Sequence, residues 1–187
     1  IVSTLAAYSI SRLKPVGTRA IMTLIFVTLG VPVMAYLIPR YIIMTDLPLV
    51  HVSLVNNFLC LWLPYSCSPF MILVLINSFD AIPKEIFEAA ELDGASDLSI
   101  FLKIALPLSR SIIYILGFMA LVTLWGDFLW PYLILRSPEL QPVSVRLYTL
   151  TRLAPRNLFL AASFIAMVPP TIAACFIVRK IKGGLTL

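Results

Sequence analysis

Long runs of apolar residues are the feature that most constrains the fold of this chain. Each run has 20 residues or more and carries almost no charged side chain. At a rise of about 1.5 Å per residue, a helix of that length crosses a hydrocarbon core about 30 Å thick. Membrane β-barrels need alternating segments of about ten residues, which are absent. The sequence therefore predicts an all-α, polytopic helical membrane protein, with spans at roughly 20–39, 54–79, 111–135 and 158–178.

A shorter apolar segment, residues 1–12, precedes these runs. It is shorter than the roughly 20 residues that a span needs, and it lacks the basic start and cleavage site of a signal peptide. We interpret it as the end of a truncated span, which gives about five spans in one transmembrane domain over 1–187. Only 12% of the residues are charged, against about 25% in an average globular domain.

Gly117 and Gly126 lie within one of the four long runs, and prolines interrupt the other three. Each proline removes a backbone donor, so the helix is expected to kink and the freed carbonyl needs another partner. Helix packing alone accounts for any single proline, whereas breaks in several spans also suit a bundle that rearranges around a pathway. The prolines concerned are Pro32, Pro64, Pro69, Pro169 and Pro170.

Basic residues indicate how the spans are oriented. Nine of the 14 Lys and Arg residues lie in three alternate segments, namely 12–19, 84–110 and 179–182, which places these segments in the cytoplasm. The segment 136–157 does not fit this charge pattern, because it carries four arginines on the predicted outer side. The net charge of +5 is thus a topology signal, and no basic stripe suggests nucleic-acid binding. The three cysteines lie inside apolar runs without CxxC spacing, so we expect no metal site or disulfide.

Five of the nine acidic residues gather between positions 85 and 97. Pro83 suits the first position of a helix that runs over Lys84–Leu92, with one small and apolar side that includes Ile86, Ala89 and Ala90. Gly94 can adopt the left-handed conformation that ends a helix. These signals predict a first cytoplasmic helix followed by a sharp turn.

A second short helix is predicted to follow, with Ser96 as its N-cap and Asp97 in its first turn. Its apolar stripe would consist of Leu98, Phe101, Leu102 and Ala105, and Pro107 would end it. We call residues 83–109 the elbow. Composition alone also fits an amphipathic loop on the membrane surface, but an acidic elbow repels anionic lipid.

The motif Glu88-Ala89-Ala90-x-x-Asp93-Gly94-Ala95 is followed by Phe101, Ile104 and Leu106-Pro107-Leu108. This pattern closely resembles the EAA loop of membrane subunits of binding-protein-dependent ABC importers. The likeness rests on eight positions between two predicted spans, and it implies the fold of a type I importer transmembrane domain. In that family the loop is the coupling helix, which lies in a cleft of the ATP-hydrolysing subunit. By this resemblance Glu88 would pair with a basic group there, Ala89 and Ala90 would allow close contact, and Gly94 would make the turn. The matching positions are Glu88, Ala89, Ala90, Asp93, Gly94, Ala95, Phe101 and Pro107.

A second stretch, TLWGDFLWPYLIL at 123–135, is similar to carbohydrate-uptake permeases akin to the smaller maltose-transporter membrane subunit. The tail Gly184-Leu185-Thr186 resembles the C-terminal G-L-T of that group. Two departures are a glycine, Gly126, in place of the usual asparagine, and a tail that stops at Leu187. The glycine at position 126 puts a polar contact at that position in doubt. The short tail puts a contact between the tail and the ATPase in doubt.

Three residues are candidates for a solute pathway: Asn57, Trp125 and Asp127. Tryptophan stacks on sugar faces, and a carboxylate accepts hydrogen bonds from hydroxyls. The alternatives are an interfacial aromatic belt, which we favour for Trp130, a capping role for Asp127, and interhelical hydrogen bonds for Asn56 and Asn57.

The chain contains no G-x-x-x-x-G-K-[ST] phosphate loop, so a partner must hydrolyse ATP and the chain itself is no enzyme and needs no cofactor. We therefore expect an ABC importer permease for a sugar or oligosaccharide in a bacterial or archaeal plasma (inner) membrane. Its partners would be a second membrane subunit in a heterodimer, two ATP-binding subunits, an extracytoplasmic solute-binding protein and the lipid bilayer. The same machine for glycerol-phosphate or polyamine, or a non-transporting membrane scaffold, stays open as an alternative.

Overall fold

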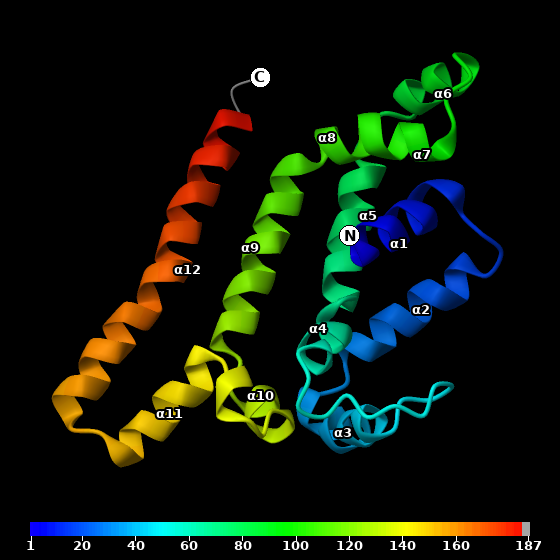
Figure 1. Cartoon of the computed structure of the whole chain (residues 1–187). Helices are drawn as coiled ribbons and strands as arrows, with labels where there is room; N and C mark the ends of the chain where they lie inside the picture. The colour runs from blue at the N-terminus through cyan, green and yellow to red at the C-terminus, as the bar shows by residue number, and fades with distance from the viewer. Residues whose placement is uncertain (185–187) are drawn as a thin grey trace. The chain divides into compact units, whose positions relative to one another are not determined.

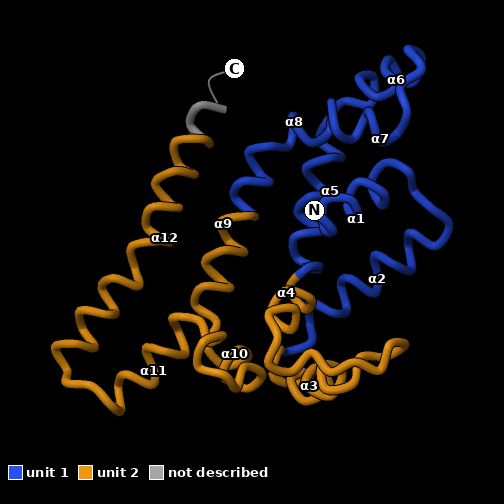
Figure 2. Tube along the Cα trace, viewed as in Figure 1, with its two compact units in different colours: residues 1–32, 66–116 blue, residues 33–65, 117–187 orange. Residues whose placement is uncertain are grey.

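The computed structural model describes the backbone of residues 1–184 and the side chains of residues 1–180. Every regular element in that part is a helix, apart from one β-bridge between Leu47 and Val52, which confirms the all-α fold class (Figure 1). The chain divides into two compact units, each described here by itself. Unit 1 comprises Ile1–Pro32 and Ser66–Leu116, and unit 2 comprises Val33–Tyr65 and Gly117–Leu187 (Figure 2).

Unit 1 is built around helix α5, whose apolar side chains form the centre of its core. The Tyr8 ring meets Phe79 edge-on at 5.8 Å and lies 5.0 Å from Phe101, so three segments share one aromatic cluster. The elements of this unit are α1 (Val2–Tyr8), the π-helix η1 (Ser9–Leu13), α2 (Thr18–Leu29), α5 (Pro69–Asp80), α6 (Lys84–Leu92), α7 (Asp97–Ile100), the π-helix η3 (Phe101–Ala105), α8 (Leu106–Leu108) and the first part of α9 (Arg110–Gly126).

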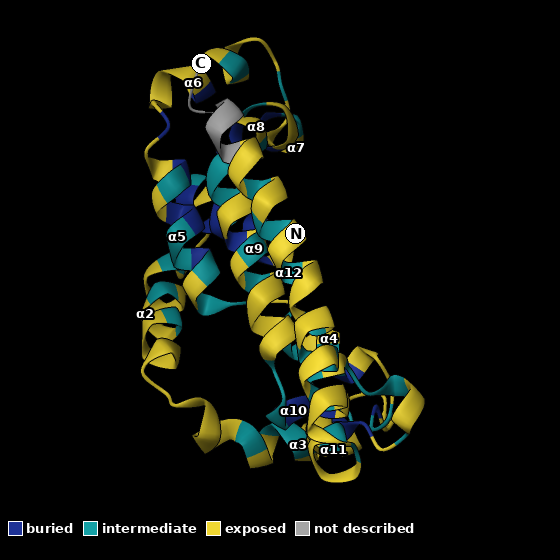
Figure 3. Ribbon diagram, turned by 90° about the vertical axis from the view of Figure 1, so that its left-hand side faces the viewer, coloured by how far each residue is buried: buried dark blue, intermediate teal, exposed yellow. Residues whose placement is uncertain are grey.

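Unit 2 has a smaller core around Trp130, Cys60 and Met44, all of them buried. Its longest element, α12, is exposed along most of its length within the described residues (Figure 3). The elements are the 3₁₀-helix η2 (Val33–Tyr36), α3 (Leu37–Thr45), α4 (Leu59–Tyr65), the remainder of α9, α10 (Leu129–Ile134), the 3₁₀-helix η4 (Pro138–Leu140), α11 (Val143–Leu153) and α12 (Arg156–Gly184).

Short breaks divide three of the four long apolar runs into separate helices. The breaks follow Leu29, Tyr65 and Gly126. Among the described residues, α12 alone is long and apolar enough to cross a membrane as one helix, by length and composition. The number rises to as many as four if each of three successive pairs forms one span: Thr18–Leu29 with Val33–Thr45, Leu59–Tyr65 with Pro69–Asp80, and Asp97–Leu108 with Arg110–Gly126.

The five prolines singled out above occupy three kinds of position. Pro32 lies in the break between α2 and η2. Pro69 is the first residue of α5, where its missing N–H is not needed, and the Ser68 hydroxyl accepts a hydrogen bond from the Met71 N–H at 3.4 Å. Pro64 and the pair Pro169-Pro170 lie inside α4 and α12, which continue through them. The helices therefore tolerate these three prolines, and the carbonyls that the prolines deprive of a donor need partners elsewhere.

Candidate functional site

The first helix of the elbow, α6, begins at Lys84 and ends at Leu92, as its sequence predicts. Pro83 is the N-cap, with φ −53° and ψ 136°, and not the first helical residue that we expected. The extended ψ explains the shift, because it turns the chain into the helix one residue later. Glu85 lies in the first turn, where its negative charge complements the helix dipole.

The turn after α6 assigns a local role to three residues of the acidic motif. Gly94 has φ +78°, the left-handed conformation, and its N–H donates to the Glu91 carbonyl at 3.0 Å. The Ala95 N–H donates to the Ala90 carbonyl at 3.0 Å. This pair of bonds is the Schellman motif, in which a small apolar contact accompanies the turn. Ala90 and Ala95 supply that contact, since both are partly buried against the core of unit 1.

The second helix begins as expected, with the Ser96 hydroxyl accepting a hydrogen bond from the Ser99 N–H at 3.4 Å and Asp97 in its first turn. Its apolar face differs from the prediction. Phe101 and Ala105 are buried, whereas Leu98 and Leu102 are exposed.

A π-helix causes this difference. Across η3 the Leu106 N–H donates to the Phe101 carbonyl, five residues back, so the wider turn shifts the buried positions. Pro107 does not end this segment, because it lies within the short helix α8, and Ser109 separates it from α9.

Two aromatic side chains and one arginine fasten the elbow to the body of unit 1. Phe87, only 6% exposed, is the buried residue of α6, and the Arg12 guanidinium lies 4.0 Å from the centre of its ring. The same guanidinium donates to the carbonyls of Phe79 and, at 2.8 Å, of Ile82. These carbonyls lie at the C-terminal end of α5, where a positive charge is favourable. Arg12 thus joins the N-terminal segment, α5 and the elbow at one point.

The sequence indicated neither contact. Arg12 counted only as a topology charge, and the apolar side assigned to α6 omitted Phe87. The partners of Arg12 lie 67 and 70 residues away along the chain, beyond the reach of any local pattern. The available signal for the buried position was Phe87, an aromatic residue in a helix whose other side chains are mostly acidic or small.

The outer surface of the elbow combines acidic and apolar groups. Glu88 and Ala89 are exposed, and Leu92 is 89% exposed. Glu88 also lines an open polar cavity of about 280 Å³ together with basic and acidic side chains. Within the described part of the chain no basic group lies within 4.0 Å of Glu88, so its carboxylate is available to a partner.

We expect Arg12→Lys to weaken the attachment of the elbow. A lysine ammonium cannot stack on Phe87 and donate to two carbonyls at once, so a loss of about 1–2 kcal/mol is expected. The measurement is the midpoint of thermal unfolding of the purified protein, which should fall.

Arg19→Lys is the matched control, because Arg19 is exposed and its side chain makes no hydrogen bond or ion pair within the described residues. Equal effects of the two substitutions would contradict the role given to Arg12.

The solute-pathway candidates all lie in unit 2, but their polar atoms bond to the protein itself. The Asp127 carboxylate accepts from the Tyr65 hydroxyl at 2.6 Å, and the Trp125 indole N–H donates to the Ala166 carbonyl at 3.1 Å. The Asn57 side-chain oxygen accepts from the Leu59 N–H at 2.9 Å, at the start of α4. Asn57 makes no side-chain hydrogen bond to the other two in the described part of the chain.

The neighbouring Asn56 has a clear local role. Its side-chain oxygen accepts from the N–H groups of Arg136 at 2.9 Å and Ser137 at 2.8 Å, and its amide donates to the Ser137 hydroxyl at 2.7 Å. It therefore holds the loop after α10. Of the tail motif, Leu185 and Thr186 lie outside the described residues.

Comparisons with known proteins identify the family of the chain. The chain matches the family model "Binding-protein-dependent transport system inner membrane component" over residues 1–182. It is 30% identical to the sulfoquinovosyl glycerol transport system permease protein of Agrobacterium fabrum, over all of this chain and 65% of the relative. It is 28% identical to the arabinooligosaccharides transport system permease protein of Halalkalibacterium halodurans, over 99% of this chain and 65% of the relative.

A solved structure has the same fold. A bacterial ABC transporter involved in the import of the acidic polysaccharide alginate superposes with a TM-score of 0.78 and 26% identity, over 96% of this chain and 69% of that one. The present chain spans about two thirds of the length of the two relatives. The family suggested by the acidic motif is thus confirmed, and the chain belongs to the binding-protein-dependent transport system inner membrane components.

Proposed function

We propose that the chain is the membrane-spanning part of a permease subunit in an ATP-driven importer, and that the elbow docks onto the ATP-hydrolysing subunits. The observation that carries this proposal is the geometry of the elbow. Its motif residues build a rigid turn at Gly94, while Glu88, Ala89 and Leu92 remain exposed above it. A small-residue surface that carries the exposed, unpaired carboxylate of Glu88 suits close contact with a basic cleft in a partner.

The mechanism is mechanical, and this chain performs no covalent chemistry. ATP binding would close the two ATP-hydrolysing subunits and draw their elbows together. Force applied at α6 would pass through Phe87 and Arg12 to the end of α5, and through Phe101 to the aromatic cluster of unit 1. The π-helix η3 and α8 would carry it on into the start of α9. Such closely packed contacts transmit strain, whereas a loose loop would absorb it.

A sugar or oligosaccharide is the proposed solute. The relatives named for sulfoquinovosyl glycerol and for arabinooligosaccharides, and the likeness of 123–135 to carbohydrate-uptake permeases, support this class. The proposed partners are a second membrane subunit in a heterodimer, two ATP-binding subunits and an external solute-binding protein. The proposed spans remain 20–39, 54–79, 111–135 and 158–178 after a partial first span, in an inner membrane with the elbow and C-terminus on the cytoplasmic side.

Uptake by the reconstituted complex tests the proposal. Proteoliposomes would contain the full-length permease, its partner subunits and the solute-binding protein, with ATP supplied on the elbow side. We expect ATP-dependent accumulation of a labelled sugar or oligosaccharide, and none when the ATP-binding subunits are omitted. Accumulation of only glycerol phosphate or a polyamine would overturn the sugar assignment. Absence of any ATP-driven flux, with the partners bound, would make the chain a scaffold.

A further inference from the structure

Two tryptophans in the segment 125–131 donate to helix carbonyls that prolines leave without a donor. In α12 the Ala166 carbonyl would ordinarily accept from the N–H of residue 170, or of residue 169 in a tighter turn. Both positions are proline and have no N–H to offer. The Trp125 indole N–H donates to that carbonyl at 3.1 Å.

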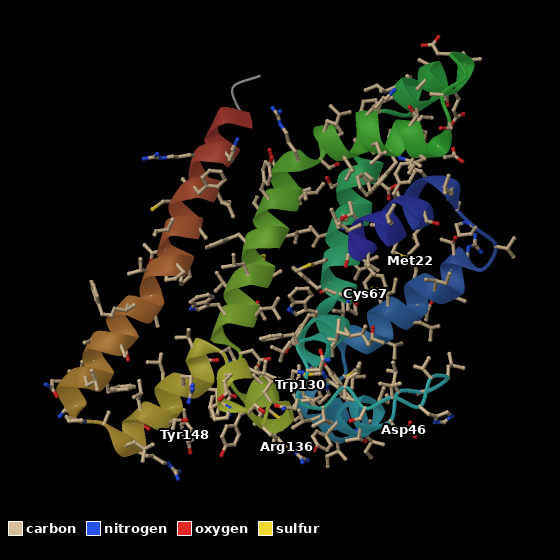
Figure 4. The ribbon with its side chains drawn as sticks, in the orientation of Figure 1. Met22, Asp46, Cys67, Trp130, Arg136 and Tyr148 are labelled. Carbon is tan, nitrogen blue, oxygen red and sulfur yellow. The ribbon has the colours of Figure 1, made fainter. Side chains whose placement is uncertain are left out.

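The same arrangement occurs independently in α4. Pro64 lies inside this helix, so the Cys60 carbonyl lacks the donor four residues further along. The Trp130 indole N–H donates to the Cys60 carbonyl at 3.0 Å, and Trp130 is only 2% exposed (Figure 4). The Arg40 guanidinium lies 3.8 Å from the centre of the Trp130 ring and covers it.

Asp127, which lies between the two tryptophans in the sequence, is also hydrogen-bonded within unit 2. The Asp127 carboxylate accepts from Tyr65 at the end of α4, and the Asp127 carbonyl accepts from the Ser144 hydroxyl of α11 at 2.7 Å. Trp125 at the end of α9, Asp127 in the link between α9 and α10, and Trp130 in α10 thus bind to α12, α4 and α11. Their hydrogen-bonding groups are used inside the protein.

We propose that Trp125 and Trp130 are positioning residues, which replace the backbone donors lost at Pro170 and Pro64. They thereby hold the proline-containing helices α12 and α4 to the end of α9 and to α10, respectively. Inside a membrane an unpaired carbonyl is costly because no water is present to bond to it. Each proline therefore makes its helix depend on one indole, and each indole fixes where that helix is held. In this role the indole N–H of each tryptophan is used inside the protein.

A double-mutant cycle tests each pair on the purified full-length permease. Trp125→Phe removes the indole donor and keeps an aromatic ring, and we expect it to lower the midpoint of thermal unfolding by about 2–6 °C. Pro170→Ala restores an N–H that can donate to the Ala166 carbonyl. In the Pro170→Ala background, Trp125→Phe should therefore lower the midpoint by less than half as much. The same relation is expected between Trp130→Phe and Pro64→Ala.

Trp62→Phe is the matched control, because Trp62 is 71% exposed and its indole makes no hydrogen bond in the described part of the chain. It should leave the midpoint unchanged. Additive effects within both cycles would overturn the proposal. The proposal would also be overturned if Trp125→Phe raised the half-saturating solute concentration for uptake and the rise persisted when Pro170→Ala was also present. That result would indicate a direct contact between Trp125 and the solute. The thermal readout needs no transport, so its outcome is independent of the proposed function.

Discussion

Gly94→Val is expected to lower strongly the coupling between ATP hydrolysis and transport. Gly94 has φ +78°, a conformation that a β-branched residue avoids. Forcing valine into it, or losing the turn, would cost about 2–3 kcal/mol, which corresponds to a roughly 30- to 150-fold loss of the competent elbow. The measurement is solute-stimulated ATPase activity and uptake in proteoliposomes.

Two further variants separate backbone strain from simple bulk. A Cβ added at Gly94 or at Gly117 meets no atom within 4 Å, so the available space is the same. Gly117 lies in the middle of α9 without a positive φ, and Gly117→Ala should leave coupling intact. Gly94→Asn should retain much of the activity, since asparagine tolerates the left-handed conformation. Normal coupling in Gly94→Val would show that this turn is not required.

Glu88→Lys is expected to reduce solute-stimulated ATPase activity and uptake by about 100-fold. The carboxylate is exposed and unpaired in the described chain, so the proposed basic partner would meet a like charge in its place. Such a juxtaposition at an interface costs several kcal/mol. Binding of the ATP-hydrolysing subunit to the permease should weaken in parallel, which co-purification would measure.

Glu139→Lys makes the same change in net charge at a distant position, in the 3₁₀-helix Pro138–Leu140. It should have little effect on either measurement. If both reversals reduced activity equally, the loss would reflect overall charge, and the docking role of Glu88 would be wrong.

The parts of the elbow that follow from local rules were predictable from sequence. The bounds of α6, the left-handed Gly94 and the Ser96 cap each depend on residues within a few positions. The apolar stripe of the second helix was predicted incorrectly, because a periodicity of 3.6 residues cannot anticipate the π-helix at Phe101–Ala105. The long apolar runs indicated helices, and Pro64 and Pro69 predicted an interruption close to the observed break after Tyr65.

Contacts between distant segments were beyond the reach of sequence patterns. The prolines signalled that some carbonyls would lack donors, yet the partners of the Cys60 and Ala166 carbonyls lie 70 and 41 residues away. Arg12 likewise gave no local hint of its position against Phe87. Such pairings depend on how the helices pack, and the periodicity of a single sequence does not reveal that packing.

Site-specific photo-cross-linking tests the docking of the elbow most directly. A photoreactive amino acid would replace Leu92, the most exposed apolar residue of the elbow, in the full-length permease assembled with its partners. Leu153, 79% exposed in the segment predicted to face outward, would serve as the comparison position. We predict a cross-link from Leu92 to the ATP-hydrolysing subunit and none from Leu153. A Leu92 adduct with the external solute-binding protein, or no adduct with the ATP-hydrolysing subunit, would contradict the account.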